Sequence, residues 1–380
     1  MKSKFFATQL STKLFLNTLL ALVLFTFYSC ESEPNTSQDT LQKVLNPRDT
    51  VKLAYAENFE IIKFTNYTKI EVKTDDINWT YYLYKDEKPL IKGTNFSFIQ
   101  LPIKRVIALS STHLGMLDKL NLNSLLVGIS SDKYVCSERI KRLNVKNVGD
   151  IGSGNFESYL KQKPNLLMHA GFDMSVPVLQ QLYQTDMAVF ANYDWKETHP
   201  LGRAEWIKVF GELFGKEAEA TTYFNQEVLR YETLKDLAKQ AIAQPKIIAG
   251  SVWGDFWNAP AGESYMAQIM ADANLDYLYK NQKGVGSLQL QFEALLADHG
   301  DTENWINAPG ASLKEIEEIN PKYAHLKAFK EGNVFSYVRN QNCFWEQSAV
   351  SPHKLLADFI TLFHPDLVDD KTLYYYSKVN

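Results

Sequence analysis

The chain has 380 residues, and 40 lysines and arginines against 44 aspartates and glutamates give it a net charge of −4. No basic cluster stands out, which argues against nucleic acid as a partner. The length is too great for one typical hydrophobic core, so we expect two domains. Aromatic residues make up 13% of the chain, enough to pack a core and also to line a ligand cleft.

The N-terminal segment has the pattern of an export signal. Lysines precede an apolar run over 14–28, which is shorter than the roughly 20 residues of a membrane-spanning helix. Ser29 and Cys30 follow, as in bacterial lipoprotein signals, in which cleavage leaves a lipid-modified cysteine at the N-terminus. We therefore expect a signal peptide over 1–29 and a lipid on Cys30. The alternative is an ordinary secretory signal with an incidental cysteine.

Residues 30–50 are rich in Glu, Ser, Asn, Thr and Asp. Such a composition cannot bury enough apolar surface to fold, which predicts a disordered tether. No later stretch is long and apolar enough to cross a membrane. We expect an exported, periplasm-facing protein that its lipid anchors to a membrane. The sequence leaves open which membrane leaflet holds the lipid.

Two further cysteines, Cys136 and Cys343, lie far apart in the chain. In an exported protein such a pair can form one disulfide. They can also be two separate buried thiols, and the sequence does not decide between these alternatives.

The first half of the chain changes its pattern near residue 100. Residues 51–100 alternate between polar and apolar or aromatic side chains, which predicts strands and hairpins. A short apolar strand over 105–109 then leads through a polar loop into a helix. Similar strand and helix units follow, and this order predicts a parallel sheet covered on both faces. We assign 51–202 to an N-terminal lobe, in which 51–100 is a β-rich elaboration.

A long helical stretch comes next. Residues 203–243 contain no proline, and their apolar residues recur at helical spacing. Gly211 and Gly215 are points where this connecting helix could divide in two. After it, the order of strand, loop and helix returns over 244–380, with two aromatic loops and a closing helix, as a C-terminal lobe. Two α/β lobes of this kind place a ligand cleft at the carboxyl ends of their strands.

Four stretches carry a resemblance to a known family. They are "RVIALSSTHLGMLDKLNL", "VGISSDKY", "VGDIGSGNFESYLKQKPNLLMH" and "FWEQSAVSPHKLLADFI". In order and spacing they resemble the substrate-binding proteins of ABC importers for ferric siderophores, haem and cobalamin, the class III periplasmic binding proteins. The resemblance covers about residues 100 to 365. It implies two lobes with parallel-sheet α/β sandwiches, a long rigid helix that joins them and a ligand cleft between them.

The resemblance also implies a function and partners. The protein would be a lipid-anchored receptor, without a cofactor of its own, that delivers a metal chelate or corrinoid to an ABC permease dimer with a cytoplasmic ATPase. We favour a ferric siderophore because Arg203, Arg339 and several tyrosines suit an anionic chelate. Cobalamin and haem are the alternatives.

One glutamate in each lobe is expected to dock on the permease. The resemblance assigns this role to Glu157 and Glu293, each near the start of a predicted helix, where the helix dipole favours a carboxylate. The alternative is that both are ordinary surface glutamates.

The residues predicted to bind the ligand lie on loops that follow strands. Aromatic faces bury a large planar ligand, although each aromatic residue could instead belong to the core. The set consists of Tyr134, His169, Phe172, Trp195, Arg203, Trp253, Phe256, Trp257, Arg339, Phe344 and Trp345, with Tyr193 and Asp194 beside Trp195.

Two other classes of function were weighed. A zinc or manganese site would use three or four ligands, and His113, His169 and His199 are candidates, with Asp255, Glu346 or His353 as a fourth. No histidine-rich loop is present to support it. An enzyme is not expected, because the sequence has no phosphate-binding P-loop, no Gly-x-Ser-x-Gly elbow and no His-Glu-x-x-His motif.

Overall fold

The computed structural model describes residues 47–380 apart from residues 153, 173–174 and 186. The predicted signal peptide and Cys30 lie outside the described residues. Pro47–Asn380 forms one compact unit. Within this unit, no helix combines the length and the apolar character needed to cross a membrane.

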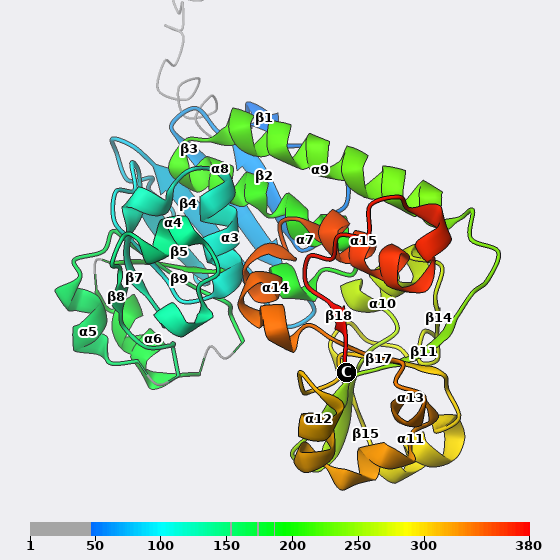
Figure 1. The fold of residues 1–380 in the computed structure, drawn as a ribbon. Coiled ribbons are helices and arrows are strands. Elements are labelled where there is room, and N and C mark those ends of the chain that lie inside the picture. Colours follow the sequence, from blue (N-terminus) through cyan, green and yellow to red (C-terminus); the bar gives the residue numbers. More distant parts are fainter. Residues whose placement is uncertain (1–46, 153, 173–174, 186) are drawn as a thin grey trace, which may run out of the picture. The chain divides into compact units, whose positions relative to one another are not determined.

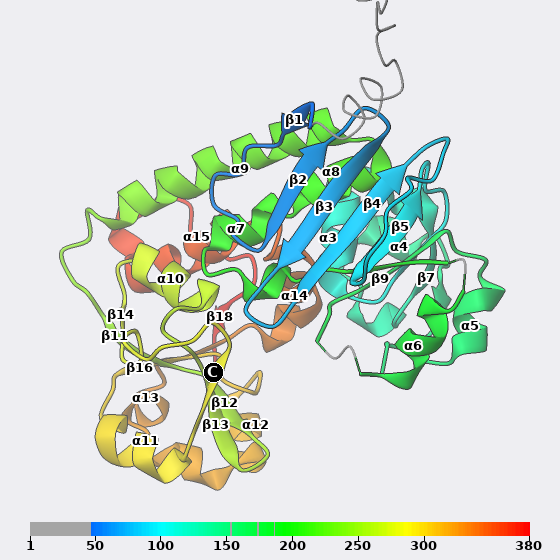
Figure 2. The same cartoon turned by 180° about the vertical axis from the view of Figure 1, so that it is seen from behind.

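The β-rich elaboration is a five-stranded sheet in the order β1-β2-β3-β4-β5. Its strands are β1 (Asp49–Thr50), β2 (Phe59–Lys63), β3 (Tyr67–Lys73), β4 (Asn78–Tyr84) and β5 (Phe96–Gln100). Neighbours pair antiparallel except β4 and β5, which are parallel. Because β1 pairs with β2, strand pairing begins inside the range predicted as a tether. Strands β2 to β5 lie in front in Figure 2.

Side-chain alternation fixes this sheet on the N-terminal lobe. Ile70 and Val72 are buried, while Lys69 and Glu71, which alternate with them, are only half-buried and form an ion pair. The buried face joins the same core cluster as Trp206 and Phe210 of the lobe's helices. The elaboration is therefore an integral part of the lobe and not a separate domain.

The N-terminal lobe holds a parallel sheet in the order β10-β9-β6-β7-β8. Its strands are β6 (Val106–Ala108), β7 (Leu126–Ile129), β8 (Lys146–Asn147), β9 (Leu166–His169) and β10 (Ala188–Ala191). Its helices are α3 (Ser111–Lys119), α4 (Glu138–Lys141), α5 (Phe156–Lys161) and α6 (Pro177–Tyr183). Leu166 and Met168 of β9 belong to one core cluster and Leu167 to another, so both faces of the sheet are covered, as predicted.

The predicted connecting helix is divided at Gly215, one of the two glycines that the sequence marks, and also at Trp206, whereas Gly211 lies inside a helix. The structure has α7 (Pro200–Glu205), α8 (Ile207–Phe214) and α9 (Glu217–Ala238), so the long helix is shorter than its predicted range. Gly215 ends α8 in the left-handed region, with φ +65°, which glycine adopts without strain. A Cβ on Gly211 would lie 2.8 Å from the Cβ of Ala220, so this glycine lets α8 and α9 pack closely. Figure 1 shows α9 running from the N-terminal to the C-terminal lobe.

The C-terminal lobe has two sheets. The larger, in the order β14-β11-β16-β17-β18, is parallel except for β18, and the smaller has the order β12-β13-β15. The strands are β11 (Lys246–Ala249), β12 (Ser251–Trp253), β13 (Phe256–Pro260), β14 (Asp276–Tyr277), β15 (Ser287–Leu290), β16 (Asn304–Ile306), β17 (Val334–Ser336) and β18 (Ser377–Lys378). The helices are α10 (Tyr265–Asp272), α11 (Phe292–His299), α12 (Leu313–Ile319), α13 (Lys327–Lys330) and α15 (Pro352–Phe363).

Both aromatic loops predicted in this lobe have regular structure. The first is the hairpin of β12 and β13. The second contains helix α14 (Gln341–Gln347). Although α14 lies late in the sequence, it packs against α3 of the N-terminal lobe (Figure 1).

Three contacts hold α14 on the N-terminal lobe, and we call them the α14 brace. A Cβ on Gly115 of α3 would lie 1.8 Å from the backbone oxygen of Glu346, so only glycine permits this approach. The buried Glu346 carboxylate accepts hydrogen bonds from the backbone nitrogens of Cys136 (2.6 Å) and Ser137 (3.1 Å). Cys136 and Cys343 form a disulfide, which answers the question that the sequence leaves open.

We expect the Cys136→Ser, Cys343→Ser double variant to be less stable by roughly 2–5 kcal/mol. The disulfide joins residues 207 positions apart, so its loss frees a long loop in the unfolded chain. Urea unfolding at pH 7 measures the free energy of unfolding directly. As a control, a reductant should lower the melting temperature of the wild type but not that of the double variant. Equal unfolding free energies of the two proteins would contradict this expectation.

Candidate functional site

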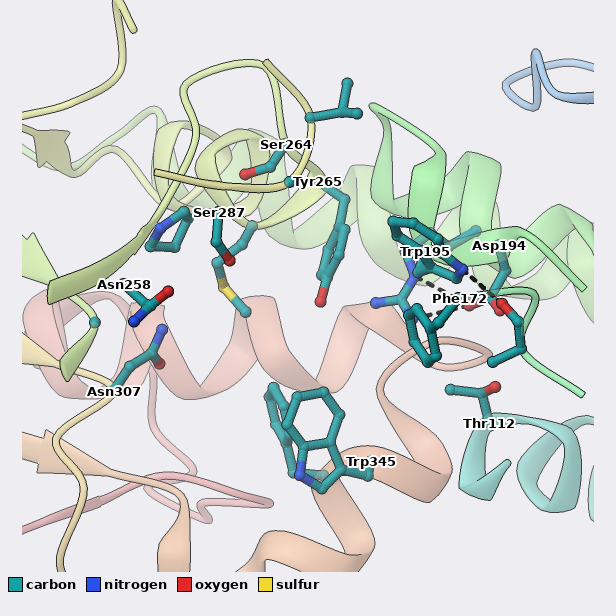
Figure 3. A pocket seen from close by; sticks show the side chains of 18 of the residues that line it. Thr112, Phe172, Asp194, Trp195, Asn258, Ser264, Tyr265, Ser287, Asn307 and Trp345 are labelled. Carbon is teal, nitrogen blue, oxygen red and sulfur yellow. Dashed lines mark hydrogen bonds and ion pairs between the residues drawn. The ribbon is translucent and has the colours of Figure 1, made fainter. Parts of the chain in front are cut away.

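A cavity of about 550 Å³ lies between the two lobes. Its N-terminal wall is built from loops that follow β6, β9 and β10, and its C-terminal wall from loops that follow β11, β16 and β17. The cavity therefore sits at the carboxyl ends of both parallel sheets, the usual ligand position in open α/β folds. Figure 3 shows this cavity from close by.

Five of the residues predicted to bind the ligand line this cavity: Phe172, Trp195, Arg203, Phe344 and Trp345. Six others do not line it: Tyr134, His169, Trp253, Phe256, Trp257 and Arg339. Their positions show where the sequence pattern is ambiguous.

Trp257 lies in the core of the C-terminal lobe because of strand alternation. In β13, Trp257 and Ala259 are fully buried, whereas Asn258 and Pro260, which alternate with them, line the cavity. The indole nitrogen of Trp257 donates to the backbone oxygen of Ala249 (3.0 Å), and the ring packs against Trp305. The sequence analysis predicted that Trp257 contacts the ligand, but it is the neighbouring Asn258 that faces the cavity.

The other five predicted residues that do not line the cavity lie at the surface, in the hairpin or at the buried end of a strand. Trp253 and Phe256 flank the turn of the hairpin, and Trp253 is 84% exposed. Tyr134 is also exposed, in a short 3-10 helix. Arg339 is exposed and donates to the backbone oxygen of Ala311 (2.8 Å). His169 is the buried last residue of β9.

Aromatic side chains line two sides of the cavity. On the N-terminal side the rings of Phe172 and Trp195 lie 4.9 Å apart, and the Trp195 indole nitrogen donates to the backbone oxygen of Ala170. On the C-terminal side, Phe344 stacks on Tyr337 at 4.1 Å and contacts the ring of Trp345. Figure 3 shows Trp345 apart from Phe172 and Trp195, on another side of the cavity. The α14 brace thus places aromatic residues of one lobe on a different side of the cavity from those of the other.

A buried ion pair forms part of the N-terminal wall. The guanidinium of Arg203 donates to Oδ2 of Asp194 through Nε (3.2 Å) and Nη2 (2.8 Å). The other carboxylate oxygen accepts from Nδ2 of Asn192 (2.9 Å). The guanidinium also lies over the ring of Tyr265, 4.0 Å from its centroid. The sequence suggested Arg203 as a partner of an anionic ligand, but Asp194 already neutralises it.

Uncharged polar residues that the sequence interpretation missed line the rest of the cavity. Asn307 follows β16 directly and Tyr337 follows β17, so the rule that selected the other loop residues also applies to them. Tyr265 begins α10 behind its cap Ser264, whose hydroxyl accepts from the backbone nitrogen of Ala267. Asn258 could have been found from the alternation in β13. Figure 3 shows Asn258 and Asn307 side by side and the Tyr265 hydroxyl pointing into the cavity.

The histidines proposed for a metal site have other places. His113 and His169 are both buried, and Nδ1 of His169 accepts from the backbone nitrogen of Gly171 (3.1 Å). His199 caps α7 by accepting from the backbone nitrogen of Leu201 (3.1 Å). Among the described residues, no group of three or more His, Cys, Asp or Glu side chains is arranged to hold a metal ion. The geometry therefore does not favour the free-metal alternative.

Burial keeps the two inner histidines neutral. It lowers the pKa of His113 to about 3, with a smaller contribution from nearby His169, whose own pKa burial lowers to about 4. Among the described residues, neither ring nitrogen of His113 has a hydrogen-bond partner. A proton on either residue would place an uncompensated charge in the core.

These shifts predict acid sensitivity. In the unfolded chain His113 and His169 bind protons as the pH falls below about 6.5, whereas in the folded chain they stay neutral. Their contribution to the free energy of unfolding is therefore complete above that pH and is lost as the pH falls toward 4. The free energy of unfolding of the wild type should fall between pH 6.5 and pH 4. We expect this fall to be smaller in His113→Met, by roughly 2–3 kcal/mol. Urea unfolding at several pH values measures this difference.

The matched control is His325→Gln, because His325 is exposed and should keep the pH dependence of the wild type. Asp358, whose pKa burial raises to about 6, titrates in every protein compared and cancels in the difference. A His113→Met variant with the wild-type pH dependence would contradict the expectation.

The two glutamates proposed for docking are both exposed and lie in first turns of helices. Glu157 lies in α5, whose cap Asn155 accepts from the Glu157 backbone nitrogen (2.8 Å). Glu293 lies in α11 and pairs with Lys322. One glutamate thus belongs to each lobe, and both are available for contact with a partner.

Comparisons with known proteins agree with this architecture. A family model described as "Periplasmic binding protein" matches residues 106–339. A protein of Methanocaldococcus jannaschii described as an uncharacterised lipoprotein is 26% identical over 91% of this chain and 90% of its own length. A second lipoprotein of that organism is 24% identical over 96% of this chain and 99% of its own.

Solved structures share the fold at low sequence identity. A periplasmic haem-binding protein of Pseudomonas aeruginosa superposes with a TM-score of 0.58 and 17% identity, covering 73% of this chain and 99% of its own. A structure described as an ABC-type Fe³⁺-hydroxamate transport system of Saccharomonospora viridis gives a TM-score of 0.52 and 16% identity, covering 69% and 93%. These likenesses concern the fold alone.

Proposed function

We propose, since the chain belongs to the periplasmic binding protein family, that its cavity captures a metal chelate or corrinoid for delivery to an ABC permease. Proteins of this family bind solutes for transport, so the chain is a substrate-binding protein and not an enzyme. A ferric siderophore is our first candidate for the cargo, with cobalamin and haem as alternatives. The energy for import would come from a separate cytoplasmic ATPase.

The observation that carries this proposal is the cavity between the two lobes. It has about 550 Å³, within the usual range for small-molecule sites, and aromatic walls on two sides. Such walls bury the faces of a large, partly apolar ligand. A bare metal ion would need three or more converging His, Cys, Asp or Glu side chains instead, and among the described residues no such group exists.

Membrane attachment through Cys30 is part of the proposal. Cys30 lies outside the described residues, and the support comes from the signal pattern in the sequence and from relatives described as lipoproteins. Anchoring keeps a receptor at high effective concentration near its permease. The protein would be exported and held at the membrane, with the Pro47–Asn380 unit in water.

Cargo binding should depend on the aromatic walls. We expect Trp345→Ala to weaken chelate binding at least tenfold, because its ring is part of the C-terminal wall. The matched control is Trp253→Ala, which removes an exposed tryptophan outside the cavity and should leave affinity unchanged. Binding can be followed by thermal shift with ferric siderophores, cobalamin, haemin and Zn²⁺. Stabilisation by none of the chelates or corrinoids would contradict the proposed function, and a shift with Zn²⁺ alone would favour the metal-ion alternative.

Permease docking should depend on Glu157 and Glu293. We expect the double variant Glu157→Ala, Glu293→Ala to bind cargo normally but to lose transport, because two separated carboxylates can orient the receptor on arginines of a two-fold partner. Uptake of radiolabelled cargo into cells and cargo affinity in vitro measure the two properties separately.

The control for docking changes one exposed glutamate in each lobe at other helices. Glu138 is in the first turn of α4 and is 70% exposed, and Glu318 in α12 is 67% exposed. The double variant Glu138→Ala, Glu318→Ala should transport normally. Normal transport by Glu157→Ala, Glu293→Ala would show that these residues do not dock.

A further inference from the structure

The cavity contains one acidic and one basic side chain, and they form an ion pair with each other. Among the described residues that line it, Asp194 and Arg203 are the only Asp, Glu, Lys, Arg or His residues. Both are buried, with side chains 3% and 6% exposed, and their charged atoms lie 2.8 Å apart. The net charge of the cavity lining is therefore zero.

The carboxylate of Asp194 offsets the charge of the Arg203 guanidinium, which uses two of its N–H groups in the pair. Both oxygens of the Asp194 carboxylate are occupied, one by Arg203 and the other by Asn192. An anion near Arg203 would be attracted by the guanidinium but repelled by the adjacent carboxylate, so the two effects largely cancel. Breaking a buried ion pair of this kind also strongly destabilises the folded protein.

Among the described residues that line the cavity, Arg203 is the only cation. Arg339 faces solvent outside the cavity. Lys196, next to Trp195 in the chain, forms an ion pair with Asp76. Lys283 is exposed beside the loop that lines the cavity, and the nearby carboxylate of Glu263 accepts from the Gly284 backbone nitrogen. His113 and His169 lie outside the lining.

The other polar side chains that line the cavity are uncharged hydrogen-bonding groups. Asn258 and Asn307 reach the cavity from β13 and from the end of β16, and the hydroxyl of Tyr265 points into it (Figure 3). Ser111 and Thr112 add hydroxyls at the start of α3, where the helix end offers only a partial positive charge. These groups suit carbonyl, amide and hydroxyl oxygens of a ligand, while the aromatic walls suit its apolar faces.

We propose that the cargo is an electrically neutral complex with an amide- or hydroxyl-bearing surface, and that polyanionic chelates are excluded. This inference rests on the proposed function. An Fe(III) ion held by three singly charged hydroxamates is neutral, and cyanocobalamin is neutral and carries many amides. A ferric tricatecholate keeps three negative charges, and haemin carries two carboxylates. Burying such charges without a free countercharge costs several kcal/mol for each ion.

The test measures affinity on the full-length protein in detergent by quenching of tryptophan fluorescence. The probes are a ferric trihydroxamate, a ferric tricatecholate, cyanocobalamin and haemin. We expect one of the two neutral probes to bind at least a hundredfold more tightly than either anionic probe. The neutral probe that binds shows whether the cargo is a hydroxamate chelate or a corrinoid. Tighter binding of the tricatecholate or of haemin would overturn the inference while leaving the proposed function standing. Binding of no probe would contradict the proposed function as well.

A single substitution should change the selectivity. Asp194→Asn keeps the size of the side chain and leaves the charge of Arg203 uncompensated, so we expect affinity for the tricatecholate to rise at least tenfold. The double variant Asp194→Asn, Arg203→Gln restores neutrality and should lose that gain. The matched control is Asp255→Asn, which removes the same charge from the exposed hairpin turn outside the lining. Thermal unfolding checks that each variant is folded, and a folded Asp194→Asn variant without the gain would overturn the inference.

Discussion

The close approach of α14 to α3 is the constraint on which the cavity depends. The backbone of Glu346 lies so near Gly115 that no side chain fits there, and the disulfide and the Glu346 carboxylate hold the same helix on the N-terminal lobe. Because α14 also carries Phe344 and Trp345, its attachment decides where one aromatic wall stands relative to the other. Any movement of the lobes must carry α14 with the N-terminal lobe, which limits how far the cavity can open without breaking these contacts.

The N-terminal elaboration supports the other wall. Backbone nitrogens of residues 54–56 donate to the buried carboxylate of Glu205, and those of Glu57 and Asn58 donate to Glu197. A buried carboxylate is tolerated when such donors compensate for lost water. Glu205 belongs to α7, the helix that carries Arg203, and Glu197 lies three residues after Asp194. The loop between β1 and β2 of the elaboration thus holds the segment that contains the ion pair of the cavity.

The cavity illustrates how one fold serves different ligands. The parallel sheets and the long helix supply the scaffold that the family shares, while the loops at the strand ends decide what is bound. In this chain those loops bring aromatic rings, amides, hydroxyls and a self-neutralised ion pair. Selection would then rest on shape and hydrogen bonding, because an ion pair that is already satisfied contributes little attraction for a charged ligand.

Much of the architecture follows from the sequence alone. Apolar runs between helical patterns predict the parallel sheets, alternation predicts the β-rich elaboration, and the family resemblance is confirmed by the match over 106–339. The rule that ligand residues follow strands selected Phe172, Trp195, Phe344 and Trp345, all of which line the cavity. These features were predictable because they depend on local periodicity and on the geometry of a parallel sheet, both of which neighbouring residues encode.

Other features depend on which residues meet across the fold. The pairing of Asp194 with Arg203, the inward turn of Trp257, the placement of α14 and the disulfide all join or orient groups through tertiary contacts. A sequence pattern shows that a residue is aromatic or charged, but not whether it already pairs or packs with a residue of another element. The sequence therefore determined the kind of protein and the edge of the sheets where the cavity lies. Only the tertiary structure decided which side chains line that cavity and that the charges of Asp194 and Arg203 cancel, because burial and pairing arise from contacts between distant segments.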